Sequence, residues 1–118
     1  MNDDTFFYFD PTSLHARADA LAEGYRAALP FPHAVIDNLL PDAIALRLAR
    51  EFPARDFVGF QRRDNPHQVL KQARLQESYF AGVSGFARHM ALLFNDHVFI
   101  DFLEKLTGIK GIIPDPHF

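Results

Sequence analysis

The chain has 118 residues, 48% of them hydrophobic, and carries 12 Lys and Arg against 15 Asp and Glu, which gives a net charge of −3. Its length predicts one domain over residues 1–118, since single domains most often contain about 100–150 residues. The near-neutral charge argues against nucleic-acid binding, which favours a basic excess, and the absence of cysteine excludes disulfides, a thiolate nucleophile and Cys-ligated metal sites.

No stretch approaches the roughly 20 apolar residues of a membrane span, and residues 1–4 (MNDD) are acidic where a signal peptide is positive. We therefore expect a cytoplasmic protein with no membrane partner. Thirteen Phe and no Trp are an unusual aromatic content. Each ring can bury roughly 150–250 Å², so we expect that some of these rings need a partner to cover them.

The N-terminal third predicts an aromatic arm followed by one helix. Residues 6–9 (FFYF) fit a short strand or a docked N-terminal arm. Thr12 or Ser13 then serves as the N-cap of a helix, which Pro30 and Pro32 end. The apolar residues at helical spacing form one buried stripe: Leu14, Ala18, Leu21, Ala22, Tyr25 and Leu29.

The central region predicts a strand and a second helix before its pattern becomes mixed. Residues 33–38 (HAVIDN) predict a short strand, and a helix with Pro41 in its first turn follows and ends at Pro53. Within residues 54–80, Asn65 and Pro66 signal a turn, and residues 69–76 fit a strand or a helix. The inner face predicted for the second helix is Ile44, Ala45, Leu48 and Phe52.

The C-terminal third predicts two further helices and a strand. Asn95 or Asp96 caps the last helix, and Gly108 ends it because glycine accepts the left-handed conformation. Residues 109–113 predict a strand that would pair with a neighbour downstream; whether it pairs with residues 33–38 stays open. The apolar stripes are Val83, Phe86, Ala87, Met90, Leu93 and Phe94 in one helix, and Phe99, Phe102, Leu103 and Leu106 in the next.

The six histidines raise the question of a metal site. Three of them precede an Asp by four residues, and on a helix this spacing places both side chains on one face. A metal needs three or four converging donors, so we interpret these pairs as solvated ion pairs or hydrogen bonds. For the pair on the predicted strand, the two side chains lie too far apart for chelation. The pairs are His15 with Asp19, His33 with Asp37, and His97 with Asp101.

No known catalytic pattern occurs in the sequence. A His-x-Asp or His-x-Glu pair with a distant second His would predict a two-His-one-carboxylate iron site, but no histidine has a carboxylate two positions later. There is also no Gly-rich phosphate loop and no Gly-x-Ser-x-Gly motif. The basic residues between Arg62 and Arg74 fit a solvated face. The sequence therefore predicts no catalytic, cofactor-binding or metal-binding residue in this chain.

Two segments nevertheless resemble one enzyme family. Residues 30–41 (PFPHAVIDNLLP), followed by a helix ending at 51–53 (EFP), resemble the opening of bacterial Fe(II)- and 2-oxoglutarate-dependent oxygenases of the prolyl-4-hydroxylase-like group. Residues 102–117 (FLEKLTGIKGIIPDPH) are similar to the segment that precedes the catalytic barrel in these enzymes. The two motifs occur in the family's order, and the resemblance spans about residues 15–118.

The resemblance implies a fold and an activity for the complete protein. The fold would be α+β and mainly helical in this chain, with helices that support the outside of a double-stranded β-helix, or jelly roll, whose barrel is mostly missing here. The complete enzyme would use Fe(II) and 2-oxoglutarate to hydroxylate a C–H bond of a peptidyl proline or a small molecule. The family's iron ligands follow the second motif, so we expect this chain alone to be inactive and His117 not to bind iron.

Two alternatives remain open. The chain could be a non-catalytic relative that binds a partner and self-associates through its apolar faces. It could also be an unrelated helical protein, or one with a metal site that these spacing rules do not detect. If the chain is part of an oxygenase, the partner of the apolar faces is the missing C-terminal barrel. If it is a non-catalytic relative, the partner is another protein or a second copy.

Overall fold

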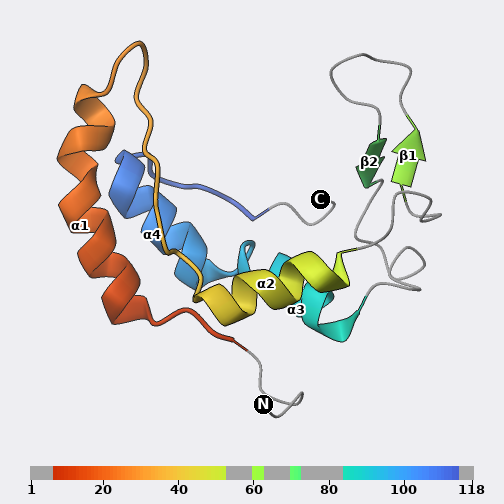
Figure 1. The fold of residues 1–118 in the computed structure, drawn as a ribbon. Coiled ribbons are helices and arrows are strands. Elements are labelled where there is room, and N and C mark those ends of the chain that lie inside the picture. The colour runs from red at the N-terminus through yellow and green to blue at the C-terminus, as the bar shows by residue number, and fades with distance from the viewer. Residues whose placement is uncertain (1–6, 53–59, 63–69, 73–83, 115–118) are drawn as a thin grey trace.

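The computed structural model describes residues 7–52, 60–62, 70–72 and 84–114, and this part is mainly helical, as the sequence predicts (Figure 1). A short antiparallel pair of strands, β1 (Phe60–Arg62) and β2 (Leu70–Gln72), places Gln61 opposite Lys71. None of the helices in the described part has the length and apolar content needed to cross a bilayer. The four helices are α1 (Pro11–Ala27), α2 (Asp42–Glu51), α3 (Gly85–Leu93) and α4 (His97–Thr107).

Helix α1 begins two or three residues earlier than predicted. Its N-cap is Asp10, not Thr12 or Ser13, and the Asp10 carboxylate accepts a hydrogen bond of 3.3 Å from the Thr12 backbone N–H. Pro11 then occupies the first turn, where its missing N–H costs nothing. The helix ends at Ala27, so Leu29 lies beyond it and is 86% exposed, contrary to its predicted place in the buried stripe.

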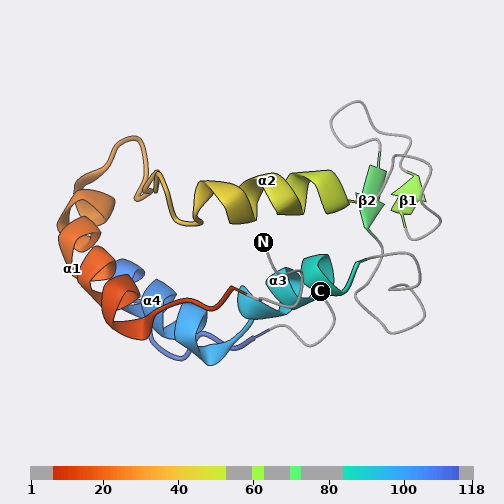
Figure 2. The same ribbon diagram turned by 60° about the horizontal axis from the view of Figure 1, so that its bottom comes forward.

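The core forms where α1 packs along α4, and the two helices lie side by side in both views (Figures 1 and 2). Ala18 and Phe102 are fully buried in this contact region, as the two stripes predict. Helix α3 adds Met90, which is 1% exposed. The complete set of buried apolar side chains is Phe9, Leu14, Ala18, Phe86, Met90, Leu93, Phe102 and Leu106.

The N-terminal arm docks on the helices through aromatic contacts and is not a strand at residues 7–9. The Phe9 ring stacks on Phe99 at a centroid distance of 5.4 Å and meets Phe94 edge-on at 5.5 Å. Offset and edge-on pairs of this kind are the favourable aromatic geometries. His89 of α3 anchors the backbone of the arm, since its Nε2 lies 2.7 Å from the Phe7 carbonyl oxygen.

The ends of α3 and α4 follow local rules. Ser84 is the N-cap of α3, and its hydroxyl accepts a hydrogen bond of 3.0 Å from the Ala87 N–H. Asp96 is the N-cap of α4, as predicted, although its side chain makes no capping hydrogen bond. Gly108 ends α4 with φ at 77°, the left-handed conformation that the sequence predicts.

The prediction of strands at residues 33–38 and 109–113 is wrong. Both segments are described, and neither is part of a sheet. Residues 33–36 belong to no helix or strand, and the chain turns at Asn38, which has a φ of 58°. Extended β-branched sequence needs a neighbouring strand to form a ladder, and the described residues offer none to either segment. The predicted turn at residues 65 and 66 lies outside the described residues.

Candidate functional site

The histidine pairs singled out in the sequence do not form. Asp19 instead lies 3.4 Å from the Lys105 ammonium of α4, which links the two packed helices. The Nδ1 of His33 lies 2.8 Å from the Phe31 carbonyl oxygen, and the Nδ1 of His97 lies 3.3 Å from the carboxylate of its neighbour Asp96. In the described part of the chain, therefore, none of the three His residues contacts the Asp that follows it by four positions.

These residues also do not gather into a metal site. Among the described residues, no three His, Asp or Glu side chains converge as a metal ion requires. His67 and His117 lie outside the described residues.

One hollow on the described surface lies where two helices begin. It has a volume of about 480 Å³ and is open to solvent, between the arm, the first turns of α1 and the start of α2. A smaller hollow of about 230 Å³ lies between α1 and the connection at residues 35–37. Arg17 borders both, and its guanidinium donates a hydrogen bond of 3.2 Å to the Asp37 carbonyl. We call these two hollows, which share the Arg17 side chain in their linings, the groove beside Arg17.

The chemistry of this groove suits binding more than catalysis. Arg17 is the only cation among the lining residues, and Asp10, Asp37 and Asp42 contribute three carboxylates. The Asp10 carboxylate already caps α1. Ser13 is the only hydroxyl nucleophile in the lining apart from the phenol of Tyr8, and no histidine lines either hollow to act as its base. The groove therefore lacks the base and nucleophile pair of an acyl-transfer site.

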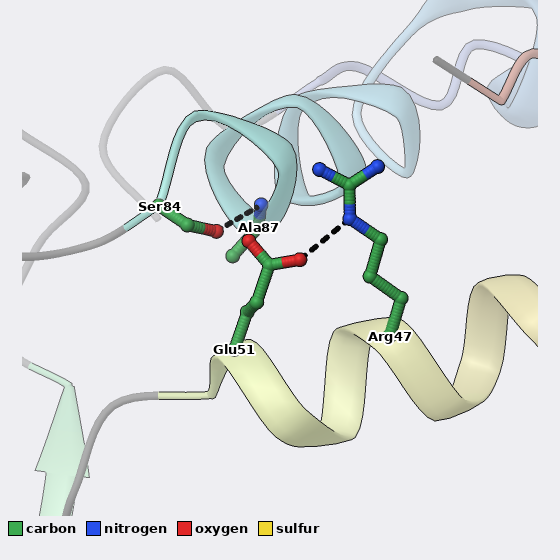
Figure 3. A network of polar contacts seen from close by, with 4 residues as sticks. All are labelled: Arg47, Glu51, Ser84 and Ala87. Atoms are coloured by element: carbon green, nitrogen blue, oxygen red, sulfur yellow. Dashed lines mark hydrogen bonds and ion pairs between the residues drawn. The ribbon is translucent and has the colours of Figure 1, made fainter. Parts of the chain in front are cut away.

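A second polar arrangement joins α2 to α3 and was not predicted (Figure 3). Arg47 and Glu51 form an ion pair within α2, with Nε 2.6 Å from the Glu51 carboxylate. The Arg47 guanidinium also lies over the Phe86 ring of α3, at 4.1 Å from its centroid, as a cation–π contact. The hydrogen bond from Arg47 lowers the pKa of Glu51, and a hydrogen bond from the Ser84 hydroxyl lowers it further. This face of α2 thus attaches to α3 through charges, with Ile44 and Leu48 beside them.

The low pKa of Glu51 predicts acid sensitivity of the α2–α3 contact. Because the folded-state pKa lies below the ordinary value of 4.5, the contact stabilises the fold above that pH, and the stabilisation is lost as the pH falls through the lowered pKa. In Glu51→Gln we expect a melting temperature lower by about 2–3 °C at pH 7, corresponding to about 0.5 kcal/mol for a partly exposed pair, and a flatter decline below pH 4.5. Circular dichroism melts at pH 3–7 measure both effects.

The matched control is Glu23→Gln, which removes an exposed carboxylate of α1 that has no hydrogen bond or ion pair in the described part of the structure. We expect this substitution to leave the decline of the melting temperature below pH 4.5 unchanged. If the melting temperatures of the wild type and Glu51→Gln declined equally below pH 4.5, the assigned role of Glu51 would be contradicted.

Large apolar side chains are exposed in the two segments that carry the family resemblance. Val35 is 79% exposed and Ile113 is 82% exposed. Phe31 and Ile109 are also more than half exposed. Single exposed apolar residues are ordinary on protein surfaces, but these lie in segments that belong to no helix or sheet. They are candidate contact surfaces for another structural element.

Comparisons with known proteins identify no relative: no family, no curated protein and no solved structure matches this chain.

Proposed function

We propose that this chain forms the helical support of an Fe(II)- and 2-oxoglutarate-dependent oxygenase of the prolyl-4-hydroxylase-like group, a cytoplasmic enzyme that hydroxylates a C–H bond. The observation that carries the proposal is the occurrence, in the family's order, of the two motifs at residues 30–41 and 102–117. Support from the structure comes from the same two places, because residues 33–36 and 109–113 lie outside any helix or strand and present exposed apolar side chains.

The role of the chain would be to support a jelly-roll barrel from outside. Helices α1 and α4 bury their stripes against each other, so they form a base that needs no barrel to hold it together. The barrel would then pack on the non-helical segments, where Phe31, Val35 and Ile113 offer apolar area. Burying such area stabilises a contact by about 25 cal/mol per Å².

The described residues do not fit the iron site of this family. No three His, Asp or Glu donors converge among them, and no His-x-Asp or His-x-Glu pair exists anywhere in the sequence. We therefore assign neither Fe(II) nor 2-oxoglutarate to a residue of this chain and derive no catalytic step from it. The proposed activity belongs to the complete enzyme, in which the donors come from the barrel.

The test compares two polypeptides, the 118-residue chain and the chain extended by the coding sequence that follows it in the gene. We expect the extension to contain a His-x-Asp motif and a distant His, and only the longer polypeptide to convert 2-oxoglutarate to succinate in the presence of Fe(II) and oxygen. We expect the 118-residue chain to bind no stoichiometric iron. An extension without iron ligands, or stoichiometric iron on the short chain, would refute the proposal.

A matched pair of substitutions tests the support role in the longer polypeptide. Ile113→Ser lies in the second family motif and Leu92→Ser lies on α3, and both side chains are exposed in this chain. We expect Ile113→Ser to lower the melting temperature and the succinate yield, whereas Leu92→Ser leaves both unchanged. Equal effects of the two substitutions would argue that residues 109–113 do not contact the barrel.

A non-catalytic module that binds a partner is the second candidate. The specific observation in its favour is that α2 has no buried residue, although six of its ten residues are apolar. The same comparison of polypeptides separates the candidates, since a binding module predicts no iron ligands in the extension and no succinate.

A further inference from the structure

The side of helix α2 that faces α3 carries charged residues, and the exposed side carries a large apolar residue. Arg47 and Glu51 face α3, and the Arg47 side chain is only 14% exposed. The opposite side presents Leu46, which is 63% exposed, together with the exposed residues Ala45 and Ala49. The outward face of α2 thus combines one large apolar side chain with small ones, and its charged residues are Asp42 and Arg50. A face of this composition can contact another protein surface.

The charged residues on this outward face are arranged symmetrically about Leu46. Asp42 precedes it by four residues and Arg50 follows it by four, so all three share one face of the helix. With a rise of 1.5 Å per residue, each charge lies about 6 Å from Leu46 along the helix axis. Both side chains are exposed, and neither forms an ion pair within the described part of the chain.

We propose that α2 pairs with α2 of a second copy of this chain, antiparallel, with the two-fold axis passing beside Leu46. In that arrangement Asp42 of each copy lies opposite the partner's Arg50, so both ends of the contact join opposite charges. A two-fold interface of this kind must be complementary to itself, and the order Asp42, Leu46, Arg50 meets that condition. A parallel pairing would place like charges opposite each other. The proposal is independent of the proposed enzymatic function.

The small side chains allow the two helices to approach closely. Ala45 and Ala49 lie next to Leu46 on the outward face, and alanine at such positions lets backbones come nearer than larger residues would. The contact is nevertheless short, since ten residues of helix span about 15 Å, and it falls below the roughly 800 Å² per partner of a stable complex. The dimer should therefore be reversible, with a dissociation constant of about 10–500 μM.

Cysteine cross-linking tests the geometry directly, because the natural chain contains no cysteine. In Leu46→Cys the two new thiols lie beside the two-fold axis and should form a disulfide dimer in most chains under mild oxidation. Asp42→Cys is the matched control, on the same face of the same helix, but antiparallel pairing separates its two copies by about 12 Å along the axis. Cα atoms more than about 7 Å apart cannot be bridged, so this variant should stay unlinked.

Mixing two charge variants tests the complementarity. Asp42→Arg and Arg50→Asp each place like charges opposite each other in their own dimers, so each alone should dimerise about tenfold more weakly. Mixed together they pair Arg with Asp at both ends, and sedimentation of the mixture should show a dimer again. The comparison uses the same chains alone and mixed, so a small loss of helix stability in either variant cancels.

The outcomes separate clearly. Efficient cross-linking through position 46 but not 42, together with a dimer that returns on mixing, supports the proposal. A monomer at millimolar concentration, equal cross-linking at both positions, or no recovery on mixing overturns it.

Discussion

Replacing Phe102 with alanine is expected to lower the free energy of unfolding by about 3–5 kcal/mol, the usual cost of removing a fully buried Phe. Phe102 is 0% exposed, and its ring lies 5.4 Å from that of Phe99. A small domain has only about 5–15 kcal/mol of stability in total, so the substitution should lower the melting temperature by more than 10 °C. Urea denaturation followed by circular dichroism at the helix band measures the change.

The matched control is Phe31→Ala. It removes the same ring, but from a side chain that is 63% exposed on the connection after α1. Surface substitutions of this kind usually change stability by less than about 0.5 kcal/mol. If Phe31→Ala destabilised the chain as strongly as Phe102→Ala, the connection would be packed inside the fold and the placement of the core would be wrong.

Enlarging Ala18 to leucine is expected to destabilise the fold by about 1–3 kcal/mol through overpacking. Ala18 is 0% exposed, at the contact of α1 with α4. Leucine has nearly the helix propensity of alanine, so the loss reports the tight approach of the two helices rather than a weaker helix. The same urea denaturation measures it.

Ala20→Leu provides the comparison, because Ala20 is exposed two residues further along the same helix. It is expected to leave the denaturation midpoint nearly unchanged. A destabilisation of similar size in both variants would show that α1 is rotated relative to the orientation described.

The helices were the predictable part of this fold. Each apolar stripe recurs at helical spacing, and the stripes of α1 and α4 predicted the buried residues Ala18, Phe102 and Leu106. The end of α4 was predictable from a single residue, since Gly108 adopts the left-handed conformation that few other residues accept. The start of α1 was not, because Asp10, Thr12 and Ser13 are all good N-caps. Only Pro11, which fits the first turn, could have decided between them.

The strands failed for a different reason. Residues 33–38 and 109–113 have the β-branched content of strands, but a strand also requires a neighbour, and β propensity depends strongly on that context. In the described structure neither segment has one. Strand β2 lies within residues 69–76, whose pattern fitted a strand or a helix, whereas no element was predicted at β1.

The surfaces were less predictable than the elements. The pattern of α2 predicted Ile44, Ala45, Leu48 and Phe52 as its inner face, but Ala45 and Phe52 are exposed and Arg47 faces α3 instead. An arginine can pack its stem and stack its guanidinium on a ring, and no local spacing reveals the ring that it will meet. The groove beside Arg17 was missed in the same way, since it depends on a contact between residues 20 positions apart.

The link between His89 and the arm joins two parts of the chain that are 82 positions apart. A carbonyl oxygen can only accept, so the Nε2 of His89 must carry a hydrogen to bond the Phe7 oxygen. The arm is therefore held to the helices in two ways, through its backbone by His89 and through the ring of Phe9 by Phe94 and Phe99.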